Sequence, residues 1–420
     1  MKRIFSLLLA CILSVLVMAG CSANTTAANL TGNIKPQTIK DSAITPAQLK
    51  AALLFSENLF SQSLKQGEEN MVLSPLSAYY ALALTANGAN GDTAKEFEEV
   101  LGLSSQDANA LCHTLQDILK SNTDETTLSF ANSVWMNEGF EANNEFLQNA
   151  VDYFAADVYS LPFKEDTAAN TINQWVSEKT DGLIPDMVDE ISPEAVMLLY
   201  NTLYMDAKWT IPFDAKNTYD GVFTLQDGST VKVPFLSASA KSYNYINTTT
   251  AEGILVPYKG SNLCYLAIKP KDGNLDSIQF VGSTLQNWLK SATYANDVVL
   301  SMPKYEAAFT MSLNDVLKPM GLTLAFEDGS ADLQNLGSYM NRDLFITNVQ
   351  QRILIRVDEE GTEAAAVTEV EVGVTSAPFE QEPPLILTFD SAYFYAVVDM
   401  ETGLPLFMGV MSNPSAAQIA

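Results

Sequence analysis

The sequence has 420 residues, of which 47% are apolar, and a formal net charge of −27 at pH 7 with a pI near 4.2. A balance this acidic excludes nucleic acid and anionic lipid as general partners, because both need a basic surface. It favours basic proteins as partners, and the apolar fraction is ample for a core.

The N-terminus has the three parts of a secretion signal. Lys2 and Arg3 precede an apolar run over residues 4–17, and Ala19-Gly20 then lead to Cys21. The run is too short to remain as a membrane-spanning helix, so residues 1–20 are predicted to be a signal peptide. Cys21 directly after Ala-Gly resembles the lipobox of bacterial lipoproteins, which predicts lipidation of Cys21. Ordinary cleavage nearby is the alternative.

The next segment, residues 21–46, is rich in Thr, Ala, Asn and Ser and has no apolar period. This composition is typical of a flexible tether. Together with the signal it predicts an exported protein, lipid-anchored at a bacterial cell surface on its extracellular or periplasmic face. No second apolar run long enough to span a membrane follows, so membrane contact is expected only through the lipid.

Helical spacing dominates the first half of the remaining chain, and strand-like runs dominate the second. Thr45 is suited to cap a helix over 46–64, and Ser74 with Pro75 is suited to start another. Further helices are predicted over 106–119, 143–154 and 168–180, and strands over 197–205, 221–225, 231–236, 253–257, 263–268, 298–302, 353–357 and 393–398. Helices first and strands later indicate an α+β fold. No proline- or serine-rich break divides residues 47–415, which are predicted to form one domain.

The residues that catalysis or metal binding would need are scarce. His113 is the only histidine, and its neighbour Cys112 diverges from it by about 100° in a predicted helix. No HExxH, CxxC or glycine-rich phosphate loop occurs. We therefore expect no enzyme, no metal site and no cofactor, although the many acids leave a two-carboxylate hydrolase open. After export and lipidation only Cys112 and Cys264 remain as thiols, and two unpaired thiols are favoured over one bridge.

Residues 358–376, Asp-Glu-Glu-Gly-Thr-Glu-Ala-Ala-Ala-Val-Thr-Glu-Val-Glu-Val-Gly-Val-Thr-Ser, carry the strongest functional signal in the chain. From Thr362 every second residue is small or β-branched and uncharged, while the interleaved positions carry three acids. This period of two predicts a strand with one buried and one wet face. Gly361 and the alanines at 364–366 are poor strand formers, however. The mixture indicates a segment that is sometimes a loop and sometimes a strand; a flexible acidic linker is the alternative.

This stretch resembles the reactive-loop hinge of serpins, protease inhibitors that work by loop insertion. Further stretches similar to serpin sequence follow in family order. They lie at residues 70–77, 81–93, 172–182, 201–218, 256–258, 302–305, 332–333 and 405–409. The resemblance covers about residues 47–412. It implies a single α+β domain with three β-sheets, a helical cap and an exposed reactive loop, about 359–388, that inserts into the main sheet.

The resemblance implies suicide-substrate inhibition, in which a serine endopeptidase attacks the loop and is trapped as a covalent acyl-enzyme when the loop inserts. At the family's spacing from Gly361 the reactive bond is Thr375–Ser376. Val374 is the alternative, because residues 377–388 are longer than usual and contain three prolines. The residue that precedes the reactive bond is small and uncharged in either register, which predicts an elastase- or subtilisin-like target protease. The implied hinge residues are Glu359, Glu360, Gly361, Thr362, Glu363, Ala364, Ala365, Ala366, Val367 and Thr368.

Two further sets of residues match functional positions of the family. The region where the main sheet opens is implied to contain Ser74, Ser77, Asn201 and Gln351, the last in place of the family's common histidine. The point where the loop begins to insert is implied to contain Trp209, Lys304 and Glu359. An ion pair between Glu359 and Lys304 is expected there, and two solvated charges are the alternative.

A serpin-like surface protein that binds something without inhibiting is the alternative function. It would share every core motif, so only the hinge separates the two. A charged residue at position 362, or a proline within 362–370, would block insertion. Neither occurs, which favours an inhibitor. We expect a monomer with a target serine protease as its partner and no nucleic acid.

Overall fold

The computed structural model describes residues 27–39, 43–119, 123, 125–180, 182, 187–192, 194–362 and 383–417. Its α-helices are α2 (Pro46–Leu64), α3 (Pro75–Ala86), α4 (Gly91–Leu101), α5 (Ser105–Leu119), α6 (Asn144–Phe154), α7 (Ala168–Lys179), α8 (Thr284–Ser291) and α9 (Asn314–Met320). Short 3₁₀ helices are η1 (Ala215–Asn217), η2 (Leu275–Ser277), η3 (Leu324–Phe326), η4 (Gln334–Leu336) and η5 (Pro414–Ala417). None of these described helices is long and apolar enough to cross a membrane.

In the described part of the chain the strands form a five-stranded main sheet, a nine-stranded sheet and two small ladders. The main sheet has the order β1 (Ala28–Asn29), β5 (Asp157–Leu161), β3 (Thr126–Asn137), β6 (Met197–Lys208), β15 (Gly361–Thr362). The nine-stranded sheet has the order β16 (Leu385–Thr388), β11 (Thr293–Pro303), β8 (Thr230–Asn247), β9 (Ala251–Pro257), β10 (Leu263–Pro270), β17 (Tyr393–Asp399), β18 (Pro405–Met411), β2 (Met71–Leu73), with β7 (Tyr219–Thr224) paired to β8. The ladders are β12 (Tyr305–Ser312) with β14 (Gln350–Val357), and β13 (Gly337–Tyr339) with β4 (Phe140–Ala142).

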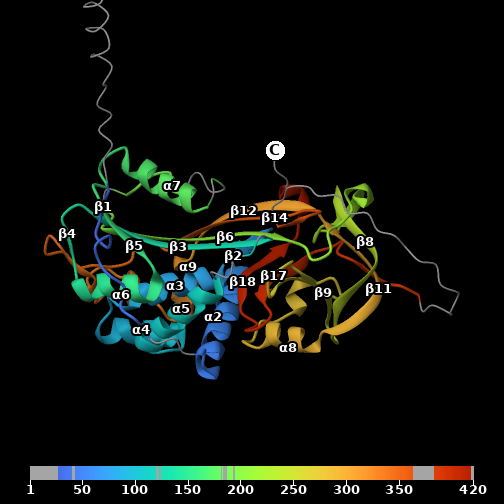
Figure 1. Ribbon diagram of the computed structural model, residues 1–420, viewed down its shortest axis with the longest axis horizontal. Coiled ribbons are helices and arrows are strands. Elements are labelled where there is room, and N and C mark those ends of the chain that lie inside the picture. Colours follow the sequence, from blue (N-terminus) through green and yellow to red (C-terminus); the bar gives the residue numbers. More distant parts are fainter. Residues whose placement is uncertain are drawn as a thin grey trace, which may run out of the picture.

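Figure 1 shows the main sheet as a layer with α7 on one face and α2 to α6 on the other. The nine-stranded sheet lies to one side of it. The resemblance implied three sheets. Long strand β8 pairs with β7 near its start and with β9 near its end, so its hydrogen bonds join what would be two sheets into one. The predicted α+β arrangement with a helical layer is confirmed.

The predicted helices are confirmed to within two residues, because local signals fix their ends. Thr45 and Gln48 form a capping box at the start of α2. The Ser74 side chain accepts a hydrogen bond from the Ser77 backbone at the start of α3, and Pro75 occupies the first turn. Helices α4, α8 and α9 were not predicted.

The prediction that strands follow helices along the chain was wrong for β3 and β5. Both belong to the main sheet and lie in the helical half of the sequence. Strand β3 ends in a run that includes Val134, Trp135 and Met136, all nearly inaccessible to solvent. This end of β3, residues 132–137, is buried on both faces, so it lacks the alternation that reveals a half-exposed strand.

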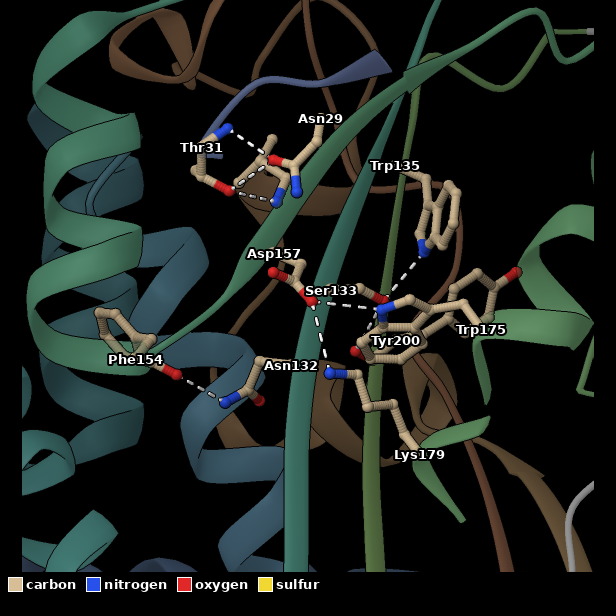
Figure 2. A network of polar contacts seen from close by, with 11 residues as sticks. Asn29, Thr31, Asn132, Ser133, Trp135, Phe154, Asp157, Trp175, Lys179 and Tyr200 are labelled. Carbon is tan, nitrogen blue, oxygen red and sulfur yellow. Dashed lines mark hydrogen bonds and ion pairs between the residues drawn. The ribbon is translucent and has the colours of Figure 1, made fainter. Parts of the chain in front are cut away.

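The prediction of a flexible tether over residues 21–46 was wrong for the central part that the structure describes. Residues Ala28 and Asn29 pair with β5 as the edge strand of the main sheet. Thr31 is buried, and its hydroxyl accepts a hydrogen bond from the Val158 backbone. Asn29 in turn accepts hydrogen bonds from Thr31 (Figure 2). The segment satisfies an open sheet edge with backbone bonds, which a hydropathy pattern does not report.

A second, smaller core lies between α7 and the main sheet and includes Trp135 and Trp175. Asp157 of β5 accepts a hydrogen bond from the Trp175 indole at 3.3 Å and lies 3.7 Å from the Lys179 ammonium (Figure 2). On the same sheet the Trp135 indole donates to the Ser133 hydroxyl. The contacts of Asp157 hold α7 over β5.

Candidate functional site

The candidate site is the seam between β6 and β14. Strand β6 pairs with β3 on one side, and β14 pairs with β12 on the other. No ladder joins β6 to β14 in the described part of the chain. Strand β15 pairs with the C-terminal end of β6, with Gly361 opposite Lys208 and Thr362 opposite Ala207. Over the described residues, the seam therefore holds a strand only at these two positions.

A tight turn leads from β14 into this short strand. The Asp358 backbone N–H donates to the Gly361 carbonyl at 3.1 Å. The Asp358 carboxylate accepts from the backbone N–H groups of Glu360 and Gly361. A Cβ atom at 361 would lie 2.1 Å from the Ala207 carbonyl oxygen, so only glycine fits so close to β6. The sequence Asp-Glu-Glu-Gly thus sets where the strand begins.

The first side chain of the inserted strand enters an aromatic pocket. Thr362 is 3% exposed, and its hydroxyl lies 2.8 Å from the Tyr258 hydroxyl. Tyr258 stacks on Trp209 with ring centroids 4.6 Å apart. The Trp209 indole donates to the Asp358 carbonyl, and its backbone N–H donates to the Glu360 carbonyl. Burial raises the pKa of Tyr258 far above its ordinary value, so this hydroxyl stays neutral.

The ion pair expected between Glu359 and Lys304 is present, with 2.6 Å between the Lys304 ammonium and a Glu359 carboxylate oxygen. The Thr218 hydroxyl donates to the other carboxylate oxygen at 2.7 Å. Burial alone would raise the pKa of Glu359, but the hydrogen bonds from Lys304 and Thr218 outweigh it and the pKa lies below its ordinary value. The Glu359 side chain is 15% exposed, which separates this pair from solvated surface charges.

Three of the four residues predicted for the opening region, Ser74, Ser77 and Gln351, are joined by hydrogen bonds. The Gln351 amide donates to the Ser74 carbonyl at 2.8 Å, and its oxygen accepts from the Ser74 backbone N–H at 3.3 Å. Ser77 joins through its backbone N–H, which donates to the Ser74 hydroxyl. Asn201 lies on β6 opposite Asn132 of β3. Gln351 and Ser74 are both buried, so these bonds cross from β14 to α3 in a region closed to water.

Several predicted residues lie outside the described part of the chain. They are the reactive-bond residues Val374, Thr375 and Ser376, the hinge residues Glu363, Ala364, Ala365, Ala366, Val367 and Thr368, and the lipidation residue Cys21.

Sequence reasoning missed three residues that complete the site: Tyr258, Thr218 and Asp358. Tyr258 and Thr218 lie in stretches that resemble the family, but nothing in the neighbouring sequence marks them as site residues. Each is far from the hinge in the sequence and contacts it only in the folded protein. Asp358 did carry one, since an aspartate three residues before a glycine is typical of a tight turn.

The residues considered for catalysis do not assemble into a site. Cys112 and Cys264 are both buried and unpaired, and burial raises the pKa of each thiol. His113 is half-buried, and its ring nitrogen lies 3.1 Å from the Asp152 carbonyl oxygen. The described residues contain no group of three His, Cys, Asp or Glu side chains that could hold a metal ion.

The family model for serpins (serine protease inhibitors) matches residues 50–414. The chain belongs to the serpin family. A serpin-like protein of Thermococcus kodakarensis is 30% identical over 367 residues, covering 86% of this chain and 84% of that protein. Alpha-1-antichymotrypsin of Homo sapiens is 28% identical over 373 residues, covering 86% and 87%. Members of this family are generally protease inhibitors.

The fold is similar to crystal structures of the thermophilic serpin tengpin. With tengpin in the native state the TM-score is 0.85 at 31% identity, covering 92% of this chain and 100% of that chain. With the same protein in the latent state the TM-score is 0.76 at 32% identity, covering 88% and 99%. The structure described above therefore resembles the native state more than the latent one.

Proposed function

We propose that this serpin is a suicide-substrate inhibitor of elastase- or subtilisin-like serine endopeptidases. Strand β15 carries the proposal. The hinge has begun to pair in the seam at Gly361 and Thr362, while β6 and β14 have no ladder between them in the described residues. A strand that continues from Thr362 gains ladder hydrogen bonds from β6 and β14 at once, and each adds to the driving force for insertion.

The register of β15 supports insertion along the whole seam. Antiparallel pairing that starts with Thr362 opposite Ala207 brings Thr368 opposite Asn201. On the other side, the turn from Asp358 to Gly361 brings Thr368 opposite Gln351. A small hydroxyl side chain would thus arrive between the two strand positions assigned to the opening region.

The covalent step uses the chemistry of the target. Its serine hydroxyl adds to the carbonyl carbon of Thr375, and the Thr375–Ser376 amide bond breaks. Thr375 is left as an ester on the protease, and Ser376 keeps the new amino group. Insertion of about a dozen residues, at roughly 0.5–1.5 kcal/mol per backbone hydrogen bond, supplies on the order of 10 kcal/mol to move the bound protease and distort its active site.

The residues around the reactive bond support the target class. Residues 361–388 contain no lysine or arginine, which a trypsin-like pocket requires, and Val374 and Thr375 suit a pocket for small uncharged side chains. The alternative is a non-inhibitory binding protein with the same fold, of which thyroxine-binding globulin, 25% identical with a TM-score of 0.77, is an example. The uncharged Thr362 and the lack of proline in 362–370 favour the inhibitor.

The test is to incubate the protein with elastase, subtilisin and trypsin and to look for an SDS-stable complex of the summed mass. We expect complexes with elastase or subtilisin, and mass spectrometry should find the ester at Thr375 or Val374. Cleavage of the loop by all three enzymes without any complex would overturn the proposal and favour a binding protein. A complex with trypsin alone would overturn the target class.

We also propose that the protein is exported and lipid-anchored through Cys21 at the bacterial cell surface, where it acts as a monomer. The charged start, the apolar run over residues 4–17 and Ala19-Gly20-Cys21 support the anchor. Cys21→Ala should move the protein from the detergent phase to the aqueous phase in a partition assay. Cys11→Ala, within the signal, is the matched control and should not. Aqueous partition of the unaltered protein would contradict the anchor.

A further inference from the structure

A cleft lies beside the C-terminal end of α2 and shares no residue with the seam. Its volume is about 620 Å³, which falls within the range of about 300–1,000 Å³ that small-molecule sites occupy. Four parts of the chain form its walls. They are the end of α2 with residues 67–69, the turn between β7 and β8, the segment around η2, and strands β17 and β18.

The floor of the cleft is apolar and already packed. Apart from Ser412, the buried residues that line it are Ile278, Phe280, Phe394 and Val410. The rings of Phe280 and Phe394 meet edge to face with centroids 5.2 Å apart. Half-buried leucines extend this surface up three of the walls: Leu64, Leu225 and Leu275. An apolar ligand would therefore meet a preformed surface that needs no rearrangement of the core.

The rim of the cleft is acidic. The exposed carboxylates that line it are those of Glu68, Glu69, Asp227 and Asp276. None of the four forms an ion pair among the described residues. Lys65 is the one basic residue among the described residues that line the cleft, and its ammonium donates to the Gln62 side chain at 3.0 Å. The negative charge of the rim is therefore left uncompensated.

Two of these carboxylates are held in place by neighbouring polar groups. Asp227 accepts hydrogen bonds from the Ser229 hydroxyl at 2.6 Å and from the Ser229 backbone N–H at 2.9 Å. These bonds lower the pKa of Asp227, so it is ionised at neutral pH. Glu69 accepts a hydrogen bond from the Asn413 amide at 2.9 Å. In each case the bonds go to a single carboxylate oxygen, and the other remains available to a ligand.

The combination of floor and rim restricts the class of ligand. The acidic rim repels anions. A bare metal ion would find no oxygen ligands on the apolar floor, and the described residues contain no group of three His, Cys, Asp or Glu side chains that could hold one. A positive group joined to an apolar body matches both parts at once, because the body covers the floor and the charge lies at the rim.

We propose that this cleft binds a small organic cation, an ammonium or amidinium group carried on an apolar body. The body packs against Phe280 and Leu225, and the cation lies between Asp227 and Asp276, which belong to different walls. The binding requires neither loop insertion nor inhibition of a protease. A protein that fails to trap elastase or subtilisin would therefore still be expected to bind the cation.

The test uses three probes with the same apolar body and different charge: naphthylmethylamine, naphthylmethanol and naphthylacetate. Binding to the full-length protein is measured at neutral pH by calorimetry and by the rise in thermal midpoint that a bound ligand causes. We expect the amine to bind at least about fivefold more tightly than the neutral alcohol, and the acetate not to bind. Added salt should weaken the amine and leave the alcohol unchanged.

Substitutions separate the contribution of the rim from that of the floor. The double variant Asp227→Asn/Asp276→Asn should weaken the amine about four- to twentyfold and leave the alcohol unchanged. Leu225→Ala should weaken both probes by a similar factor, about three- to tenfold. Asp220→Asn, an exposed acid on β7 that does not line the cleft, is the matched control and should leave every affinity unchanged. The thermal midpoint without ligand checks that each variant folds.

Three outcomes would overturn the proposal. The first is acetate binding as tight as that of the amine, and the second is an unchanged affinity for the amine in the double variant. The third is failure of the amine to bind the unaltered protein at millimolar concentrations. Each of these results is independent of whether the protein forms a covalent complex with a protease.

Discussion

The seam of the main sheet and the centre of the nine-stranded sheet are built on opposite principles. In the centre, every residue of β17 and β18 is buried, and each strand has ladder partners on both sides. Along the seam, β14 alternates buried and half-buried residues and has a ladder only with β12 in the described chain. A continuous apolar ladder is a permanent scaffold, whereas an interrupted one bordered by polar side chains can accept another strand.

The largest effect is expected from a substitution that prevents the strand from entering the seam at its first position, Thr362. Thr362→Arg would place a charge in a pocket that buries the threonine and contains Tyr258 and Trp209. Burying an unpaired charge costs several kcal/mol, so we expect covalent complex formation to fall at least about 100-fold. Cleavage should then yield no rise in thermal stability.

Thr362→Val is the matched control for that substitution. It keeps the shape and loses only the hydrogen bond to Tyr258, so it should still form the complex. Calorimetry of both cleaved variants distinguishes the two. An arginine variant that inserts as well as the valine variant would mean that the strand does not enter through this pocket.

The second prediction concerns the nine-stranded sheet, which we expect to stay the same when the loop inserts. Phe394 of β17 is 3% exposed and packs against Phe60 and Phe280. Phe394→Ala should destabilise the fold by about 3–5 kcal/mol, as large-to-small changes in cores do. The thermal midpoints of the intact and the loop-cleaved forms should fall together. A fall confined to the intact form would show that the nine-stranded sheet also changes on insertion.

Sequence reasoning succeeded where the signal is local and failed where it is set by the fold. The caps at Thr45 and Ser74 are readable in the chain, and so were the helices that they start. The strand expected from the period of two after Gly361 stays a prediction, because residues 363–382 lie outside the described chain. The ion pair of Lys304 with Glu359 was accessible only through the family resemblance. Strand β3 and the contact of Tyr258 with Thr362 depend on which surfaces cover them, and no spacing in the sequence reports that.

The third prediction concerns the hydrogen bonds that join β14 to the start of α3. Gln351→Ala removes both hydrogen bonds to the Ser74 backbone and leaves buried groups unsatisfied. We expect the native state to lose about 1–3 kcal/mol and to convert faster on warming to the inserted form or to polymers. Gln350→Ala, the half-buried neighbour on β14, is the control and should behave like the unaltered protein. Unchanged inactivation kinetics for Gln351→Ala would contradict the role of this glutamine.

The smallest expected effect comes from the ion pair at the start of the hinge. Glu359→Gln should cost the native state about 1 kcal/mol, since the lysine is partly exposed and the hydrogen bond from Thr218 can remain. Glu359→Lys should cost more, because it sets like charges beside Lys304. In both variants the hinge is held less firmly, and polymer yield on heating should rise, more for lysine. Glu360→Lys, whose backbone rather than carboxylate contacts Trp209, is the matched control.

The pH dependence provides a sharper check of the same pair. The pKa of Glu359 lies below its ordinary value of 4.5 in the folded protein. A lowered pKa means that the stabilisation is fully present above pH 4.5 and is lost as the pH falls through the folded-state pKa below that value. The difference in conversion rate between the unaltered protein and Glu359→Gln should therefore be constant from about pH 5 to about pH 8, and should close under more acidic conditions. A difference that persists in acid would mean that the amide disturbs packing around Thr218 and that the charge of Glu359 does not restrain the hinge.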